Sequence, residues 1–150
     1  MPPHQSSLQT SSKFWMVFGK YMAPVLSSEG DKINWINFKT GVRYLRFNMQ
    51  VQYNSVSIAI EMSQPDIILQ QHQFDLLISF KKEFECICGS YWKWEKIAVQ
   101  TQNKNTSLVI ASLKNVSILN QEQWPDIISF LKINLILLDK FWSEFKFAFE

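Results

Sequence analysis

Several features of common enzymes and nucleic-acid-binding proteins are missing from this 150-residue sequence. It has four glycines, and none stands in a G-x-G-x-x-G or Walker pattern, so neither phosphate-binding loop is predicted. No G-x-S-x-G motif occurs, which excludes the nucleophile elbow of α/β-hydrolases. The longest basic run is Lys81-Lys82, so the sequence lacks the clustered basic stripe that nucleic-acid binding usually needs.

Long apolar runs are also missing. The N-terminal residues MPPHQSSLQTSSK are polar and contain no apolar region of the kind that signal peptides carry. The most apolar window, residues 127–138, is too short to span a bilayer and contains Lys132 and Asn134. We therefore expect a cytoplasmic protein without membrane contacts.

Cysteine is scarce, with Cys86 and Cys88 in a C-x-C arrangement. A structural zinc site needs four ligands, whereas His72 is distant in the sequence and His4 lies near the N-terminus. The sequence predicts no metal site and no cofactor, and it predicts that both cysteines act as small apolar residues near a helix end.

Apolar and aromatic side chains are abundant. They make up 47% and 15% of the residues, which predicts a globular domain with a sizeable core. The 12 phenylalanines and 6 tryptophans favour a tightly packed interior or an association surface.

The most regular pattern covers residues 41–62 and predicts a β-hairpin with two different faces. The apolar face consists of Leu45, Phe47, Met49, Val51, Val56, Ile58, Ile60 and Met62. The other face consists of Tyr44, Arg46, Asn48, Gln50, Ser57, Ala59 and Glu61.

Two registers keep the apolar residues of this hairpin on one face. In the first, the turn is Tyr53-Asn54 and Arg46 lies directly opposite Glu61, which gives the better charge pairing. In the second, the turn is Asn54-Ser55, which has the better turn chemistry because asparagine tolerates a positive φ.

The remaining patterns predict three helices and a second pair of strands. A first helix starts after Ser11 or Ser12 and ends before Pro24, and it is followed by a loop or a loop enclosing a short strand around Trp35. Residues 63–89 predict one helix that Gly89 ends, and the strands are expected at 91–101 and 106–113. Residues 1–10 are expected to be a disordered tail and residues 11–150 a single domain.

The C-terminal helix is the clearest helical pattern. Apolar residues recur every three or four positions, at Ile128, Leu131, Leu135, Leu138, Trp142, Phe145 and Phe149. Asn120 and Gln123 resemble a capping box, and Pro125 is expected to delay the start to about Trp124. The opposite side is also apolar, so the helix is either buried on two sides within one domain or forms the contact of a homodimer.

These elements follow the order α-β-β-α-β-β-α. Hairpins connected by helices predict an α+β fold with an antiparallel sheet of about four strands and helices mainly on one face.

The polar face of the first hairpin is the candidate binding site. Tyr44, Arg46, Asn48 and Glu61 offer hydrogen-bonding groups and a charge pair, and we expect aromatic walls from nearby tryptophans, Trp35, Trp92 and Trp94. The alternative is a solvated sheet surface with an ordinary ion pair.

Segments along nearly the whole chain resemble a bacterial domain-of-unknown-function family. They include KFWMVFGKYM, SSEGDKINWINFKTGVRYLRFNM, SIAIEM, WKWE, NQEQWPDIISF and LDKFWSEFKFAF. The resemblance implies a domain that occurs alone or C-terminal to nuclease-like domains of the PD-(D/E)xK type, and it implies no activity. The chain itself lacks that nuclease motif, because Ser63, two residues after Glu61, stands where the motif has lysine.

We expect a non-catalytic interaction or oligomerisation module that binds a protein partner or a second copy of itself. One alternative is a nucleic-acid-binding accessory domain that uses Lys39, Arg43 and Arg46 with nearby aromatic rings. A second alternative is an enzyme centred on Arg46 and Glu61.

Overall fold

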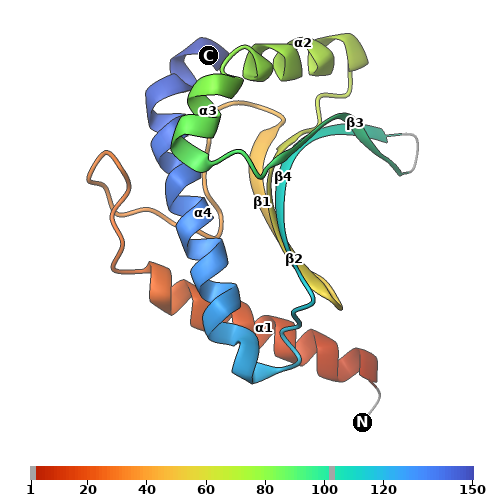
Figure 1. Ribbon diagram of the computed structural model, residues 1–150, viewed down its shortest axis with the longest axis vertical. Helices are drawn as coiled ribbons and strands as arrows, with labels where there is room; N and C mark the ends of the chain where they lie inside the picture. The colour runs from red at the N-terminus through yellow and green to blue at the C-terminus, as the bar shows by residue number, and fades with distance from the viewer. Residues whose placement is uncertain (1–2, 102–103) are drawn as a thin grey trace.

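The computed structural model describes residues 3–101 and 104–150 and has an α+β fold (Figure 1). The elements are α1 (Pro3–Met22), β1 (Leu45–Val51), β2 (Ser55–Met62), α2 (Ile67–Ile78), α3 (Lys81–Cys88), β3 (Lys93–Thr101), β4 (Lys104–Lys114), η1 (Gln121–Gln123), α4 (Trp124–Phe145) and η2 (Lys146–Phe149). The strands form an antiparallel sheet in the order β1-β2-β4-β3. The predicted fold class is confirmed.

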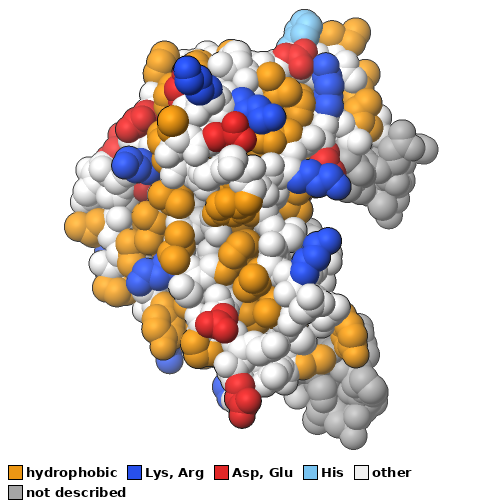
Figure 2. Space-filling view, viewed as in Figure 1, with side chains coloured by type: hydrophobic (Ala, Val, Ile, Leu, Met, Phe, Trp, Pro, Cys, Tyr) orange, Lys and Arg blue, Asp and Glu red, His pale blue; other side chains and the backbone are white. Residues whose placement is uncertain are grey.

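The sheet is curved, and the helices pack on its convex side (Figure 1). In Figure 2 the molecule is hollowed on the opposite, concave side. The convex side carries the buried apolar residues of the strands, which pair across the sheet as in Ile58 with Ala111 and Ile60 with Val109. The concave side is therefore the polar face that the sequence predicts.

The first hairpin adopts the register with the better charge pairing. Leu45 lies opposite Met62 and Arg46 opposite Glu61, and the amide of Gln52 donates to the carbonyl of Ser55. Neither Tyr53 nor Asn54 has a positive φ. The observed turn therefore does not use the positive φ that asparagine tolerates, which was the argument for the other register.

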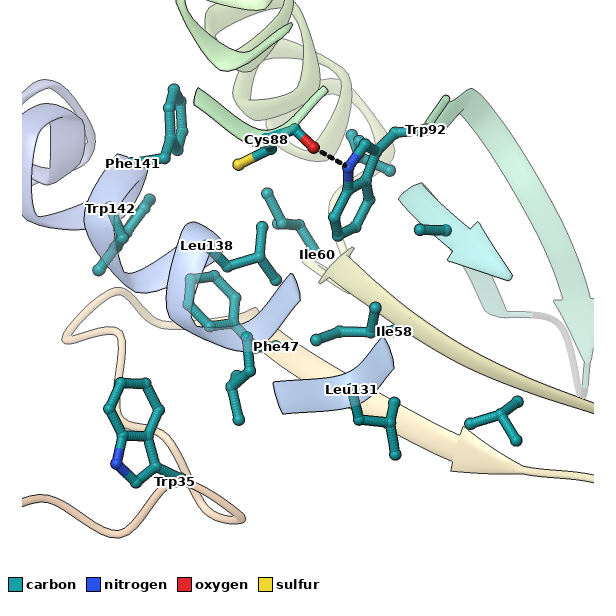
Figure 3. Packing of buried hydrophobic residues seen from close by; sticks show 14 of the residues in the cluster. Trp35, Phe47, Ile58, Ile60, Cys88, Trp92, Leu131, Leu138, Phe141 and Trp142 are labelled. Atoms are coloured by element: carbon teal, nitrogen blue, oxygen red, sulfur yellow. Dashed lines mark hydrogen bonds between the residues drawn. The ribbon is translucent and has the colours of Figure 1, made fainter. Parts of the chain in front are cut away.

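The core lies between the sheet and α4 (Figure 3). The predicted stripe of α4 is confirmed as its buried side from Ile128 to Trp142, and the helix starts at Trp124 as expected. Figure 3 shows Leu131, Leu138 and Trp142 directed toward Phe47, Ile58 and Ile60 of the sheet. The capping box is wrong, because Asn120 accepts from the amide of Glu122 while Gln123 accepts from the amide of Ser117.

Residues 63–89 form two helices rather than the predicted one. Asp66 caps α2 by accepting from the amides of Ile68 and Leu69, and the chain turns at Ser79 and Phe80 before α3. The ring of Phe80 lies 5.0 Å from that of Phe145, between centroids. The break thus lets Phe80 pack on the end of α4, and no glycine or proline in the sequence marks it.

Two other predictions along the chain need correction. The first helix starts at Pro3 instead of after Ser11, so residues 3–10 of the predicted tail belong to α1, while Met1 and Pro2 lie outside the described residues. Proline suits a first helical turn, and nothing between Pro3 and Ser12 interrupts a helix. Of the two alternatives for the segment around Trp35, the loop without a strand is the one observed, since residues 25–44 form a loop.

None of the helices in the described residues combines the length and the apolar character that crossing a bilayer requires.

Candidate functional site

The predicted charge pair is present on the concave side of the sheet. Arg46 Nε donates to Glu61 Oε1 at 2.9 Å, and Asn48 Nδ2 donates to Glu61 Oε2 at 3.1 Å. Both oxygens of Glu61 are therefore engaged by side chains of the neighbouring strand. The Arg46 side chain is 62% exposed, so water screens the pair, which makes it an ordinary surface interaction.

The concave side continues from this cluster across the sheet. Beside Glu61 and Ala59 on β2 lie Leu108 and Ile110 on β4, and Lys93 and Glu95 on β3 form a second ion pair at 3.1 Å. An apolar strip is thus flanked by an ion pair on each side. Arg46 and Asn48 line a cavity of about 240 Å³ at the β1 edge of the sheet. Glu61 does not line this cavity.

The tryptophans that we expected beside this face lie in the core. Trp35 is 3% and Trp92 is 4% exposed, and their indole nitrogens donate to the carbonyls of Val25 and Cys88. Trp94 pairs with Val109, whose side chain is on the convex side, and packs against Phe74 and Phe84. The predicted aromatic walls are therefore wrong, because these rings supply the core.

Tyr44 is also separated from the Arg46 cluster. It has a φ of 64°, its ring lies 4.9 Å from the guanidinium carbon of Arg43, and it lines a different cavity with Gln64 and Gln70. Lys39 lines a third cavity. The basic residues of the nucleic-acid alternative thus face different sites.

A larger cavity, which the sequence did not indicate, lies between the loop after α1 and α4. Its volume is about 350 Å³. It is lined by Ser27, Glu29, Asp31, Ile33, Asn34, Asn37, Phe38, Lys39, Thr40, Asp139, Trp142, Ser143 and Lys146. We call it the loop–α4 cavity.

Asp139 is the notable side chain in this cavity, because it is a carboxylate of which only 5% is exposed. Its Oδ2 accepts from the amide of Ser28 at 2.7 Å, and burial raises its pKa above the usual value of an aspartate. The sequence signal that could have identified Asp139 is its position in the helix. It lies four residues after Leu135 and three before Trp142, both in the buried stripe. A carboxylate so placed is expected to lie at the edge of the core.

The side of α4 that faces away from the sheet carries a second stripe. It consists of Asp126, Phe130, Ile133, Leu137 and Lys140, spaced alternately four and three residues apart. Ile133 is 53% exposed, Phe130 and Leu137 are half-buried, and the two charged ends are exposed. We call these residues the outer stripe.

The two cysteines differ in environment. Cys88 is buried and its Sγ lies 3.5 Å from the carbonyl oxygen of Leu137, and burial raises its pKa to about 12. Cys86 is exposed, so the expectation that both act as apolar residues is wrong for Cys86. Within residues 3–101 and 104–150, no three His, Cys, Asp or Glu side chains gather as a metal site would require.

The family model of a domain of unknown function (DUF4268) matches residues 10–146, which is most of the chain. No curated protein and no solved structure matches the chain. The match confirms the resemblance to a domain-of-unknown-function family. Bacterial origin and association with nuclease-like domains stay predictions.

Proposed function

We propose that this chain, which belongs to the DUF4268 family of domains of unknown function, is a non-catalytic module that self-associates through α4. The observation that carries the proposal is the outer stripe, a partly exposed apolar line centred on Ile133 with opposite charges at its two ends. A second copy of the chain is the partner that this pattern fits.

The outer stripe is long and accessible. Asp126 and Lys140 are 14 residues apart in the helix, which corresponds to about 21 Å along its axis. Figure 2 shows hydrophobic side chains along α4 on the viewed face. Ile133 is exposed at the centre of the stripe, and Phe130 and Leu137 beside it are half-buried against the core; an apolar surface of this kind on a helix is typical of a helix–helix contact.

The charges make the stripe complementary to itself. Asp126 and Lys140 each lie seven residues from Ile133, which stands at the centre. If two copies of α4 pack antiparallel about a twofold axis through Ile133, Asp126 of each protomer faces Lys140 of its partner. A twofold contact repeats this pair, so both ends of the interface gain a compensated charge.

Two exposed side chains extend the apolar surface beside the stripe. Tyr91 is 58% exposed, and its hydroxyl donates to Asn134 on α4. Leu26 is 57% exposed and borders a small cavity with Ile136 and Lys140. An interface centred on Ile133 therefore has apolar and aromatic groups on both flanks, as the centres of protein interfaces commonly do.

Light scattering at micromolar concentration tests the proposal. We expect a mass near twice 17.7 kDa for the native chain and a monomer for Ile133→Glu, because a buried unpaired carboxylate is incompatible with an apolar contact. Ile68→Glu is the matched control, since Ile68 is 62% exposed on α2, and this variant should remain a dimer. A native chain that stays monomeric at several hundred micromolar would refute self-association.

Charge exchange tests the orientation of the contact. Lys140→Asp places two like charges together at both ends of the dimer, and we expect the dissociation constant to rise by up to about thirtyfold. The double variant Asp126→Lys/Lys140→Asp restores opposite charges and should recover most of the affinity. If the double variant is as weak as the single one, the helices do not pack antiparallel about Ile133.

A further inference from the structure

The loop–α4 cavity combines an aromatic floor with a buried carboxylate. The rings of Trp142 and Phe38 belong to the core cluster and form part of the cavity lining. Trp142 is held in place because its Nε1 donates to the carbonyl of Thr40 at 2.8 Å. A floor fixed by such packing and hydrogen bonding keeps its shape when the cavity binds a ligand.

The loop that covers the cavity is attached at two points to α4 and at one point to η2. The amide of Ser28 donates to Asp139, the carbonyl of Thr40 accepts from Trp142, and Lys146 Nζ lies 3.3 Å from Glu29 Oε2 at the rim. These contacts use one carboxylate oxygen of Asp139. The Ser28 side chain also lies close enough to the carboxyl to lower its pKa, against the larger effect of burial.

No lysine or arginine of the described residues forms an ion pair with Asp139, although the charge of Lys146 favours its ionised form and that of Glu29 opposes it. Glu29 and Lys146 pair with each other, and Asp31 and Lys39 are exposed side chains of the loop. Asp139 is nine-tenths buried, and burial of its charge is costly, while its Oδ1 is not among the buried side-chain atoms that lack a partner and so faces the cavity. A ligand that brings a positively charged N–H donor to Oδ1 offsets part of that cost.

We propose that the loop–α4 cavity binds a small organic amine. Its ammonium group donates to Oδ1 of Asp139 and to the hydroxyl of Ser143, while its apolar body lies on the rings of Trp142 and Phe38. Aromatic rings also attract a cation placed over their faces. The cavity volume of about 350 Å³ is at the lower end of ligand pockets, which fits an amine with a single ring.

Three probes of similar shape separate the contributions of charge and shape. Phenethylamine, phenethyl alcohol and phenylacetate carry a positive, neutral and negative head group on the same ring. Isothermal titration calorimetry at neutral pH is expected to show that the amine binds at least about tenfold more tightly than the alcohol, with phenylacetate weakest.

Asp139→Asn tests the carboxylate without removing the contact to the loop. The asparagine oxygen still accepts from the amide of Ser28, so the loop keeps its attachment while the charge is lost. We expect this variant to bind the amine and the alcohol with similar affinity. Asp75→Asn, a change in an exposed ion pair on α2, is the matched control and should keep the preference for the amine.

A second variant tests the cavity in case Asp139→Asn does not fold. Ser143→Leu fills the half-buried side of the cavity and should weaken the amine and the alcohol alike. The proposal is overturned if phenethylamine does not bind at millimolar concentration, if the three probes bind equally, or if a folded Asp139→Asn variant retains the preference for the amine.

Discussion

Trp142 is the side chain whose removal should damage the fold most clearly. It is 2% exposed, and its ring centroid lies 6.1 Å from that of Phe47 and 5.1 Å from that of Phe149. It therefore connects α4 with the sheet and with the C-terminal turn. Truncation to alanine removes these contacts and leaves a cavity in a closely packed interior.

The expected cost of Trp142→Ala combines two effects. Loss of a large buried ring typically costs about 3–5 kcal/mol. The carbonyl of Thr40, which accepts from Trp142 Nε1, loses its donor, and an unsatisfied buried acceptor costs about 1–3 kcal/mol more unless water replaces the donor. Since small domains are usually stable by about 5–15 kcal/mol, the variant should be close to unfolding at room temperature.

Thermal or urea denaturation followed by circular dichroism measures this loss. Trp142→Phe retains most of the ring contacts but not the hydrogen bond, so it should lose roughly 1–3 kcal/mol and lie between the native protein and the alanine variant. Phe147→Ala is the matched control, because Phe147 is 68% exposed and its removal should change the melt little. An unchanged melt for Trp142→Ala would show that this ring is not part of the core.

Three further predictions follow from the surroundings of individual side chains. Arg46→Ala should cost at most about 1 kcal/mol in a denaturant titration, because its side chain is 62% exposed. A thiol reagent at pH 8 should label Cys86 and spare Cys88 until the protein unfolds, because burial raises the pKa of Cys88 to about 12. Asp139→Asn should raise the melting temperature at neutral pH, and its advantage should vanish at acidic pH, where a melting series would find both proteins equal.

The sign of the Asp139 effect follows from the direction of its pKa shift. Burial raises the pKa of this carboxyl in the folded protein above its value in the unfolded chain. Below the unfolded value both states hold the proton, so the group contributes no penalty. As pH rises from the unfolded value to the raised folded pKa, the unfolded chain loses the proton first, and the free energy of unfolding falls; above the folded pKa it changes no further.

Periodicity predicted the hairpin and the C-terminal helix because burial repeats along each element. In residues 45–62 the apolar face is buried or half-buried at alternate positions, with the small Ala59 also buried on the other face, and in α4 every third or fourth side chain is buried. Charge was also informative, since the register that pairs Arg46 with Glu61 is the observed one. Both signals are local to one element or to one pair of adjacent strands.

Features set by contacts between distant elements could not be predicted in this way. The helix break at Phe80 depends on the rings of Phe145 and Phe149, about 65 positions further along the chain. Of the tryptophans that we expected beside the polar face, Trp92 and Trp94 pack on Phe84 of α3, and Trp35 packs on Phe38 of its own loop. Asp139 was missed because only the loop that folds over it makes it buried.

The two proposals concern different sides of α4 and can fail separately. Asp139 lines the loop–α4 cavity and Lys140 ends the outer stripe, although both also border the cavity beside Leu26. Consecutive side chains project about 100° apart around a helix. Ile133 does not line the cavity, and it is six residues from Asp139. We therefore expect Ile133→Glu to produce a monomer that binds phenethylamine with unchanged affinity, and Asp139→Asn to lose that binding while it remains a dimer. If Ile133→Glu also abolished amine binding in a folded monomer, the binding site would require the second copy of the chain. One chain alone would then not form the complete cavity.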